Sequence, residues 1–168
     1  MIHRNIITPT EREELITWVH DTGWFPVPNF SSVVTYPPPL EPVFHSLMYE
    51  IQNRLVKLTG LKTILYNNTT TVFVTTHGIG INVMHESPLG YGEHIDLLTE
   101  DGQHIERCVL LVNKSDLGGE LYIDGQDVDL NEGDAVQFVI TKQPHGIKKV
   151  YGRKPRITFH FSWIAENV

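Results

Sequence analysis

Residues 156–163 read Arg-Ile-Thr-Phe-His-Phe-Ser-Trp, and this stretch decides the fold. Successive side chains of a β-strand point to opposite faces, so the polar residues share one face and the apolar residues share the other. In a small barrel the apolar face packs into the core, which leaves the polar face to line water or a polar cavity. Because Arg156 is followed on that face by Thr158, such a cavity would suit a carboxylate ligand.

Similar β-rich runs occupy most of the chain from residue 63 onward. They cover residues 70–75, 81–85, 94–98, 106–113, 120–123, 127–130, 135–140 and 146–150, and turn residues bound each of them. The Asp-Gly pairs at 101–102 and 124–125 and the Glu-Gly pair at 132–133 are typical of hairpin turns. About eight strands on tight turns predict a double-stranded β-helix, also called a jelly roll.

Two helices are predicted before the strands. Thr8-Pro9-Thr10-Glu11 offers an N-cap, a proline for the first helical position and a glutamate that can close a capping box. This first helix is expected to end at Gly23. A second helix is expected over residues 43–58, with apolar residues on one stripe and Gly60 as its stop. We expect both helices to pack on one sheet of the barrel, giving a mainly β fold with N-terminal helices.

The segment between the two helices, residues 24–42, is rich in proline and aromatic residues. Prolines at this density are incompatible with regular structure, so an ordered loop over the body is expected. The loop either covers the exposed sheet or forms a lid over a site, and Trp24 and Tyr36 are the residues that would test a lid.

Length and composition set limits on the protein. The 168 residues suffice for one domain, with helices and a Pro-rich loop in residues 1–60 supporting a barrel over 62–165. A net charge of -7 argues against nucleic-acid or membrane partners. Cys108 is the only cysteine, which excludes an internal disulfide and suits a reducing compartment. No apolar run approaches the roughly 18 residues of a membrane span, so we expect a soluble, cytoplasmic protein.

The nine histidines raise the question of which of them converge. In His94-Ile95-Asp96 the imidazole and the carboxylate would share one face of a strand and could hold one ion. His145, at the start of a late strand, is a further candidate. His104-Ile105-Glu106 is a rival pair that we place on a hairpin rim, and Glu100 imitates part of a cupin metal set.

The order of these motifs resembles a known family. The resemblance is to the iron(II)- and 2-oxoglutarate-dependent dioxygenases, specifically their prolyl-4-hydroxylase-like branch, and it covers roughly the half of the chain from Asn82 to Trp163. It rests on His94-x-Asp96, Gly118-Gly119-Glu120-Leu121, Gly133-Asp134-Ala135-Val136-Gln137-Phe138, His145, and Arg156 with Trp163 closing the strand.

The resemblance implies a metal site, a cosubstrate and a reaction. His94, Asp96 and His145 would form the facial triad that binds iron(II). Arg156 would clamp the distal carboxylate of 2-oxoglutarate, with Thr158 hydrogen-bonded to the same group. Members of the family use molecular oxygen to convert 2-oxoglutarate to succinate while they hydroxylate a C–H bond. The expected substrate is a prolyl or another side chain of a peptide, protein or amino acid, and the retained aspartate favours hydroxylation over halogenation.

Further residues are expected to line the predicted cavity, and for some of them a second interpretation stays open. Many relatives place a tyrosine nine residues before the first iron histidine, and His85 stands there, so we assign it to the cosubstrate pocket, against an ordinary barrel histidine. Asn82 is assigned to the same pocket. Tyr91 occupies the place of a second aromatic residue, and His160 is expected in the cavity wall. Arg107 either lines the substrate mouth or caps a strand edge.

Two other readings of the sequence stay open at this point. The chain could be a non-catalytic jelly-roll module for binding or structure that retains the histidines, or a cupin-type metal dioxygenase, although the latter leaves Arg156 without a role. A nucleic-acid demethylase is disfavoured, because the chain is acidic and Ser162 stands where such enzymes place a second arginine. Neither the substrate's identity nor the oligomeric state, which stays unknown, is indicated by the sequence.

Overall fold

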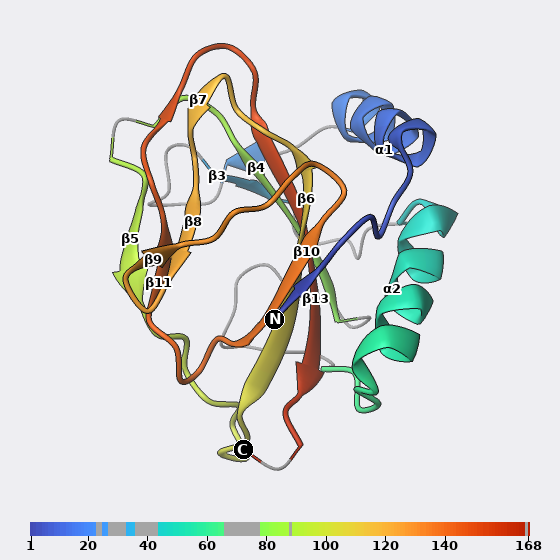
Figure 1. Ribbon diagram of the computed structural model, residues 1–168, viewed down its shortest axis with the longest axis vertical. Coiled ribbons are helices and arrows are strands. Elements are labelled where there is room, and N and C mark those ends of the chain that lie inside the picture. Colours follow the sequence, from blue (N-terminus) through green and yellow to red (C-terminus); the bar gives the residue numbers. More distant parts are fainter. Residues whose placement is uncertain (23–24, 27–32, 36–43, 66–77, 88, 167) are drawn as a thin grey trace.

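The computed structural model describes residues 1–22, 25–26, 33–35, 44–65, 78–87, 89–166 and 168. Helices α1 (Pro9–Asp21) and α2 (Ser46–Thr59) lie side by side on one face of a large sheet, and a smaller sheet faces the other side of it (Figure 1). This arrangement confirms the predicted jelly roll with two helices packed on one sheet.

The large sheet has seven antiparallel strands in the order β1-β10-β6-β13-β4-β3-β2. Strand β13 lies in the middle, with Thr158 opposite Asn82 on β4 and opposite Leu111 on β6. The strands are β1 (Ile2–His3), β10 (Ala135–Val139), β6 (Ile105–Asn113), β13 (Arg156–Ile164), β4 (Ile79–Met84), β3 (Val33–Thr35) and β2 (Phe25–Pro26).

The smaller sheet has four strands in the order β5-β11-β8-β9, and a two-stranded sheet of β12 and β7 continues beside it. These strands are β5 (Tyr91–His94), β11 (His145–Ile147), β8 (Leu121–Ile123), β9 (Gln126–Asp127), β7 (Leu117–Gly118) and β12 (Val150–Tyr151). The space between the small and the large sheet is the interior of the barrel.

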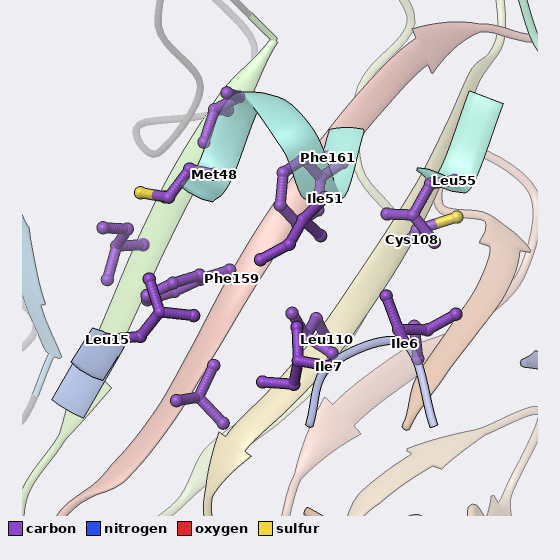
Figure 2. Close-up of a cluster of buried hydrophobic side chains, with 14 of the residues drawn as sticks. Ile6, Ile7, Leu15, Met48, Ile51, Leu55, Cys108, Leu110, Phe159 and Phe161 are labelled. Carbon is purple, nitrogen blue, oxygen red and sulfur yellow. The ribbon is translucent and has the colours of Figure 1, made fainter. Parts of the chain in front are cut away.

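The main apolar core lies between the large sheet and the helices. Ile157, Phe159, Phe161 and Trp163 of β13 are completely buried here. In Figure 2, Phe161 is drawn next to Ile51 of α2, and Phe159 between Met48 of α2 and Leu15 of α1. Burial of each such side chain is worth roughly 1.5–3 kcal/mol, so this layer holds β13 firmly in place. The alternation predicted for residues 156–163 is therefore realised, and the polar face of β13 points away from the helices.

The helix termini follow the sequence signals closely. Thr8 Oγ1 accepts a hydrogen bond from the Glu11 N–H, and a Glu11 carboxylate oxygen accepts one from the Thr8 N–H, which completes the predicted capping box. Helix α1 ends at Asp21, slightly before the predicted stop at Gly23. Helix α2 begins at Ser46, later than predicted, and Gly60 ends it as expected with a φ of 73°.

The Pro-rich segment departs from its prediction. Strands β2 and β3 form within residues 24–42, at the edge of the large sheet, where a strand tolerates proline because one side needs no hydrogen-bond partner. Trp24, Tyr36 and the predicted strand 70–75 lie outside the described residues. None of the helices in the described part of the chain is long and apolar enough to cross a membrane.

One ion pair joins the two helices and generates a pH prediction. Both carboxylate oxygens of Glu11 accept hydrogen bonds from Arg54 on α2, at 2.6 and 2.9 Å. The hydrogen bonds from Arg54 lower the pKa of Glu11 from 4.5 to about 2. Because the folded-state pKa is depressed, the stabilisation is complete above the unfolded-state pKa and is lost as the pH falls through the folded-state value.

We therefore expect Glu11→Gln to lower the free energy of unfolding by about 1–2 kcal/mol at pH 7 and by much less near pH 2. Urea unfolding at a series of pH values measures this difference. Glu50→Gln is the matched control, because Glu50 also faces Arg54 but at 3.7 Å and with a largely exposed side chain. If the loss of stability in Glu11→Gln did not change with pH, the ion pair between Glu11 and Arg54 would not be its cause.

Candidate functional site

Two histidines meet where two strands of the small sheet pair. His94 is the last residue of β5 and His145 is the first of β11, and the antiparallel register places them opposite each other. Their ring centroids are 4.4 Å apart. Strand β5 ends at His94 instead of starting there as predicted, so Asp96 lies beyond the strand. Its N–H donates to the carbonyl of Ile140, which keeps the aspartate beside the two rings.

The three side chains form a compact donor set. Asp96 Oδ1 lies 3.2 Å from His94 Nε2 and 3.9 Å from His145 Nε2. Each histidine has its Nδ1 against a backbone carbonyl, of Gly92 at 2.9 Å and of Gln143 at 2.8 Å. A hydrogen bond donated from Nδ1 leaves the Nε2 lone pair for a metal. Two imidazoles and one carboxylate are the donors that a non-haem iron(II) site uses.

Among the described residues, this is the one group of histidine, cysteine, aspartate or glutamate side chains close enough to hold an ion, with all ligand atoms within 4.8 Å of one another. Burial raises the pKa of Asp96, but the hydrogen bond with His94 and the charge of Arg107 outweigh it and bring the pKa below its ordinary value. Burial also lowers the pKa of His145. For His94, burial is outweighed by the hydrogen bond with Asp96, and the pKa is raised.

Arg107 on β6 supports the carboxylate of this donor set. Its Nε donates to Ser162 Oγ at 3.0 Å, and its Nη1 lies 3.4 Å from Asp96 Oδ2. The residue is 5% exposed, so it lies inside the barrel and does not cap a strand edge. Sequence reasoning left its role open and missed its contact with Asp96.

The second functional group is Arg156, at the start of β13. Its Nε donates to the Gly119 carbonyl at 2.7 Å and its Nη1 to Thr158 Oγ1 at 3.4 Å. Burial lowers its pKa to about 10, so the guanidinium is charged at neutral pH. No carboxylate of the described residues forms an ion pair with it, although it is only 2% exposed. A buried cation in this position is suited to an anionic ligand.

The Gly-Gly pair before β8 makes room for this arginine. Gly118 and Gly119 have φ values of 74° and 77°, a backbone region that glycine adopts without strain. A Cβ at position 119 would lie 3.1 Å from Arg156 Cδ and 2.7 Å from Ser115 Oγ. The pair is thus the bend expected between strands, and it also supplies the carbonyl that orients the guanidinium.

One cavity of about 110 Å³ connects the two groups. Its polar wall comprises Asn82, Tyr91, His94, Asp96, Arg107, His145, Arg156 and His160. Four buried side-chain atoms of the described residues have no hydrogen-bond partner, and three of them belong to cavity residues: Asn82 Oδ1, Arg107 Nη2 and His160 Nδ1. Unpaired polar atoms concentrated in one cavity indicate a polar ligand.

The structure places most of the residues predicted for the cavity in its wall. Asn82 and Tyr91 line it, and His160 lies in the wall as expected. Thr158 is completely buried between Arg156 and His160 and does not itself line the cavity.

The assignment of His85 is corrected. Its side chain is exposed, it follows the end of β4, and it does not line the cavity. The physical reason is that β4 ends at Met84, so His85 lies beyond the strand that carries Asn82 into the cavity.

The rival histidine pair also lies away from the donor set. His104 contacts Thr141 Oγ1 at 2.9 Å through Nδ1, and Glu106 accepts a hydrogen bond from Gln137. Glu100 is exposed and does not line the cavity.

Comparisons with known proteins bear on the fold. No protein-family model matches the sequence, and no curated protein matches it. HygX from Streptomyces hygroscopicus, solved with nickel and 2-oxoglutarate bound, is similar with a TM-score of 0.67 and 13% identity over 99% of this chain and 83% of that chain.

Two prolyl hydroxylases are similar as well. The viral collagen prolyl hydroxylase vCPH from Paramecium Bursaria Chlorella virus-1 has a TM-score of 0.64 and 11% identity, over 98% of this chain and 96% of that one. A prolyl hydroxylase from Trichoplax adhaerens, in complex with a hypoxia inducible factor peptide fragment, has a TM-score of 0.63 and 15% identity, over 98% and 83%. The protein therefore has the double-stranded β-helix fold that these hydroxylases and HygX share.

The donor geometry predicts which histidines bind a divalent cation. We expect His94→Ala and His145→Ala each to weaken cobalt(II) binding at least about a hundredfold, because each removes one of three ligands. Calorimetric titration of the purified protein measures the affinity, and circular dichroism verifies folding. His104→Ala is the control, since this histidine lies outside the donor set. Equal losses in all three variants would refute the assignment.

Proposed function

We propose that the protein is an iron(II)- and 2-oxoglutarate-dependent oxygenase. The observation that carries this proposal is that a two-histidine, one-carboxylate donor set lines the same cavity as a buried arginine, which forms no ion pair with any described residue. A metal site alone would leave Arg156 unexplained, as a cupin-type enzyme does. A site for an organic anion alone would leave the convergence of His94, Asp96 and His145 unexplained.

The donor set fits iron(II). His94 Nε2, Asp96 Oδ1 and His145 Nε2 would hold the metal on one side and leave other coordination positions for ligands. When bound, iron(II) supplies the site for 2-oxoglutarate and oxygen and the oxidising power for a C–H bond. The Nδ1 contacts with Gly92 and Gln143 fix both rings for this task.

The charges of the cavity fit a dicarboxylate. Arg107 is compensated by Asp96, whereas Arg156 keeps its charge for a ligand. One carboxylate of 2-oxoglutarate would approach the metal, and the distal one would pair with Arg156. The hydrogen bond that Arg156 donates to Thr158 orients the guanidinium. Apolar side chains, among them Val109, Leu121 and Phe138, line the remaining wall and would limit the access of water to the reacting end.

The overall reaction consumes one 2-oxoglutarate and one oxygen molecule for each C–H bond hydroxylated. One oxygen atom enters the carboxylate of succinate as carbon dioxide leaves, and the other enters the substrate as a hydroxyl group. For the substrate we propose a prolyl or another side chain of a peptide, protein or amino acid. The similarity to two prolyl hydroxylases, one solved with a peptide, supports this class.

The separate roles proposed for the metal ligands, which bind iron(II), and for Arg156, which binds 2-oxoglutarate, can be tested. We expect the protein to form succinate from 2-oxoglutarate when iron(II) is present, and to form none without it. Arg156→Ala should raise the KM for 2-oxoglutarate about thirtyfold or more, since removing one partner of a buried charge pair typically costs about 2–5 kcal/mol. Its affinity for iron(II), measured by calorimetry under anaerobic conditions, should stay within a few-fold.

Arg153→Ala is the matched control, because Arg153 is an exposed arginine in the turn before β13. It should leave both constants unchanged. A wild-type protein that binds iron(II) but neither binds 2-oxoglutarate nor forms succinate would refute the proposed function.

A further inference from the structure

His160 is a buried histidine in the cavity that the site described so far does not use. It stands on the polar face of β13, after Arg156 and Thr158 and before Ser162. Ser162 accepts a hydrogen bond from Arg107, which in turn reaches Asp96. His160 therefore lies midway between the arginine that would bind the distal carboxylate and the end of the cavity that holds the metal ligands.

The hydrogen bonds around His160 are compatible with a proton on its Nδ1 atom. Arg156 Nη1 donates to Thr158 Oγ1 at 3.4 Å, and Thr158 Oγ1 lies 3.1 Å from His160 Nε2. A threonine hydroxyl has one hydrogen to donate and two lone pairs, so Thr158 Oγ1 can donate to Nε2 of His160 while it accepts from Arg156. In this arrangement Nε2 is the acceptor, and the neutral ring carries its hydrogen on Nδ1.

The Nδ1 atom is buried and has no hydrogen-bond partner in the described structure. Burial, with the nearby charges of Arg107 and Arg156, holds the pKa of His160 well below its ordinary value, so the ring is neutral at pH 7. A buried donor without an acceptor is destabilising, because it has lost its hydrogen bonds to water. An unpaired N–H group in the wall of a ligand cavity is therefore suited to an acceptor on the ligand.

We propose that His160 is a cosubstrate-binding residue, whose Nδ1–H donates to an oxygen atom at the metal-chelating end of 2-oxoglutarate. This inference rests on the proposed function and adds a second contact to it, since Arg156 serves the distal carboxylate. The chelating end offers acceptors in its carboxylate and keto groups, both of which lie on the metal side of the clamp.

Three substitutions separate the two nitrogens of the ring. The amide of Asn places a hydrogen-bonding atom near the position of Nδ1, and that of Gln places one near Nε2, whereas Phe keeps the ring shape and removes both. We expect His160→Gln and His160→Phe to weaken 2-oxoglutarate binding about tenfold or more. His160→Asn should stay within about threefold of the wild type.

The binding constant is measured by anaerobic calorimetry with 2-oxoglutarate and saturating iron(II), and iron(II) affinity is measured separately without 2-oxoglutarate. Iron(II) affinity should be unchanged in all three variants. Circular dichroism and the thermal midpoint verify that each variant is folded. Trp163→Phe is the control, since it removes the fourth unpaired buried atom, Trp163 Nε1, and Trp163 does not line the cavity. It should not alter 2-oxoglutarate affinity.

The outcomes distinguish this inference from the proposed function. Wild-type affinity in His160→Gln combined with loss in His160→Asn would show that only the Thr158 contact matters, and would overturn the inference. Equal affinity in all variants would overturn it as well and leave the proposed function standing. If the wild-type protein with iron(II) binds no 2-oxoglutarate, both fail. If His160→Phe does not fold, the 2-oxoglutarate affinities of His160→Asn and His160→Gln still test whether Nδ1 contacts the cosubstrate.

Discussion

Strand β13 contacts the apolar core on one face and the polar cavity on the other, and the site depends on this arrangement. Its apolar residues are packed under α1 and α2, while its polar residues face the space between the sheets. The helices thus hold the strand whose opposite face presents Arg156 and His160 to the cavity. A shift of the strand by one residue would exchange the two faces, burying charge in the apolar core, so the packing of Phe159 and Phe161 fixes the position of the polar row.

The cavity contains more positive than negative charge, and the protein distributes this charge unequally. Arg107 is tied to Asp96 and Ser162, so its charge is balanced within the fold. Within the described part of the chain, Arg156 donates hydrogen bonds to two neutral groups, the Gly119 carbonyl and the Thr158 hydroxyl. The carboxylate of Glu120 acts on it without a direct ion pair. Buried charges that lack an opposite charge destabilise a folded protein, and they persist where a ligand completes them. In the proposed function, this unequal distribution places the dicarboxylate at the Arg156 end of the cavity and the metal at the Asp96 end.

Local signals in the sequence predicted the features that depend on neighbouring residues. The capping box of α1, the glycine after α2 and the alternation of β13 each need only a few consecutive residues, and all three are present. The contact of Arg107 with Asp96 was not predictable in this way, because it depends on the register of β6 against β13, which places Arg107 opposite Ser162. The motif spacing that places His85 in the pocket assumes that the inner strand continues through residue 85, whereas β4 ends at Met84.

The buried polar atoms without hydrogen-bond partners link ligand binding to the stability of the fold. Among the described residues such atoms concentrate in the cavity, where each costs about 1–3 kcal/mol in a protein whose total stability is typically about 5–15 kcal/mol. The fold therefore retains, at this one place, groups that weaken it. A ligand that pairs with Arg107, Asn82 and His160 removes part of that cost on binding, so the affinity of the site and the stability of the folded chain are linked through the same atoms.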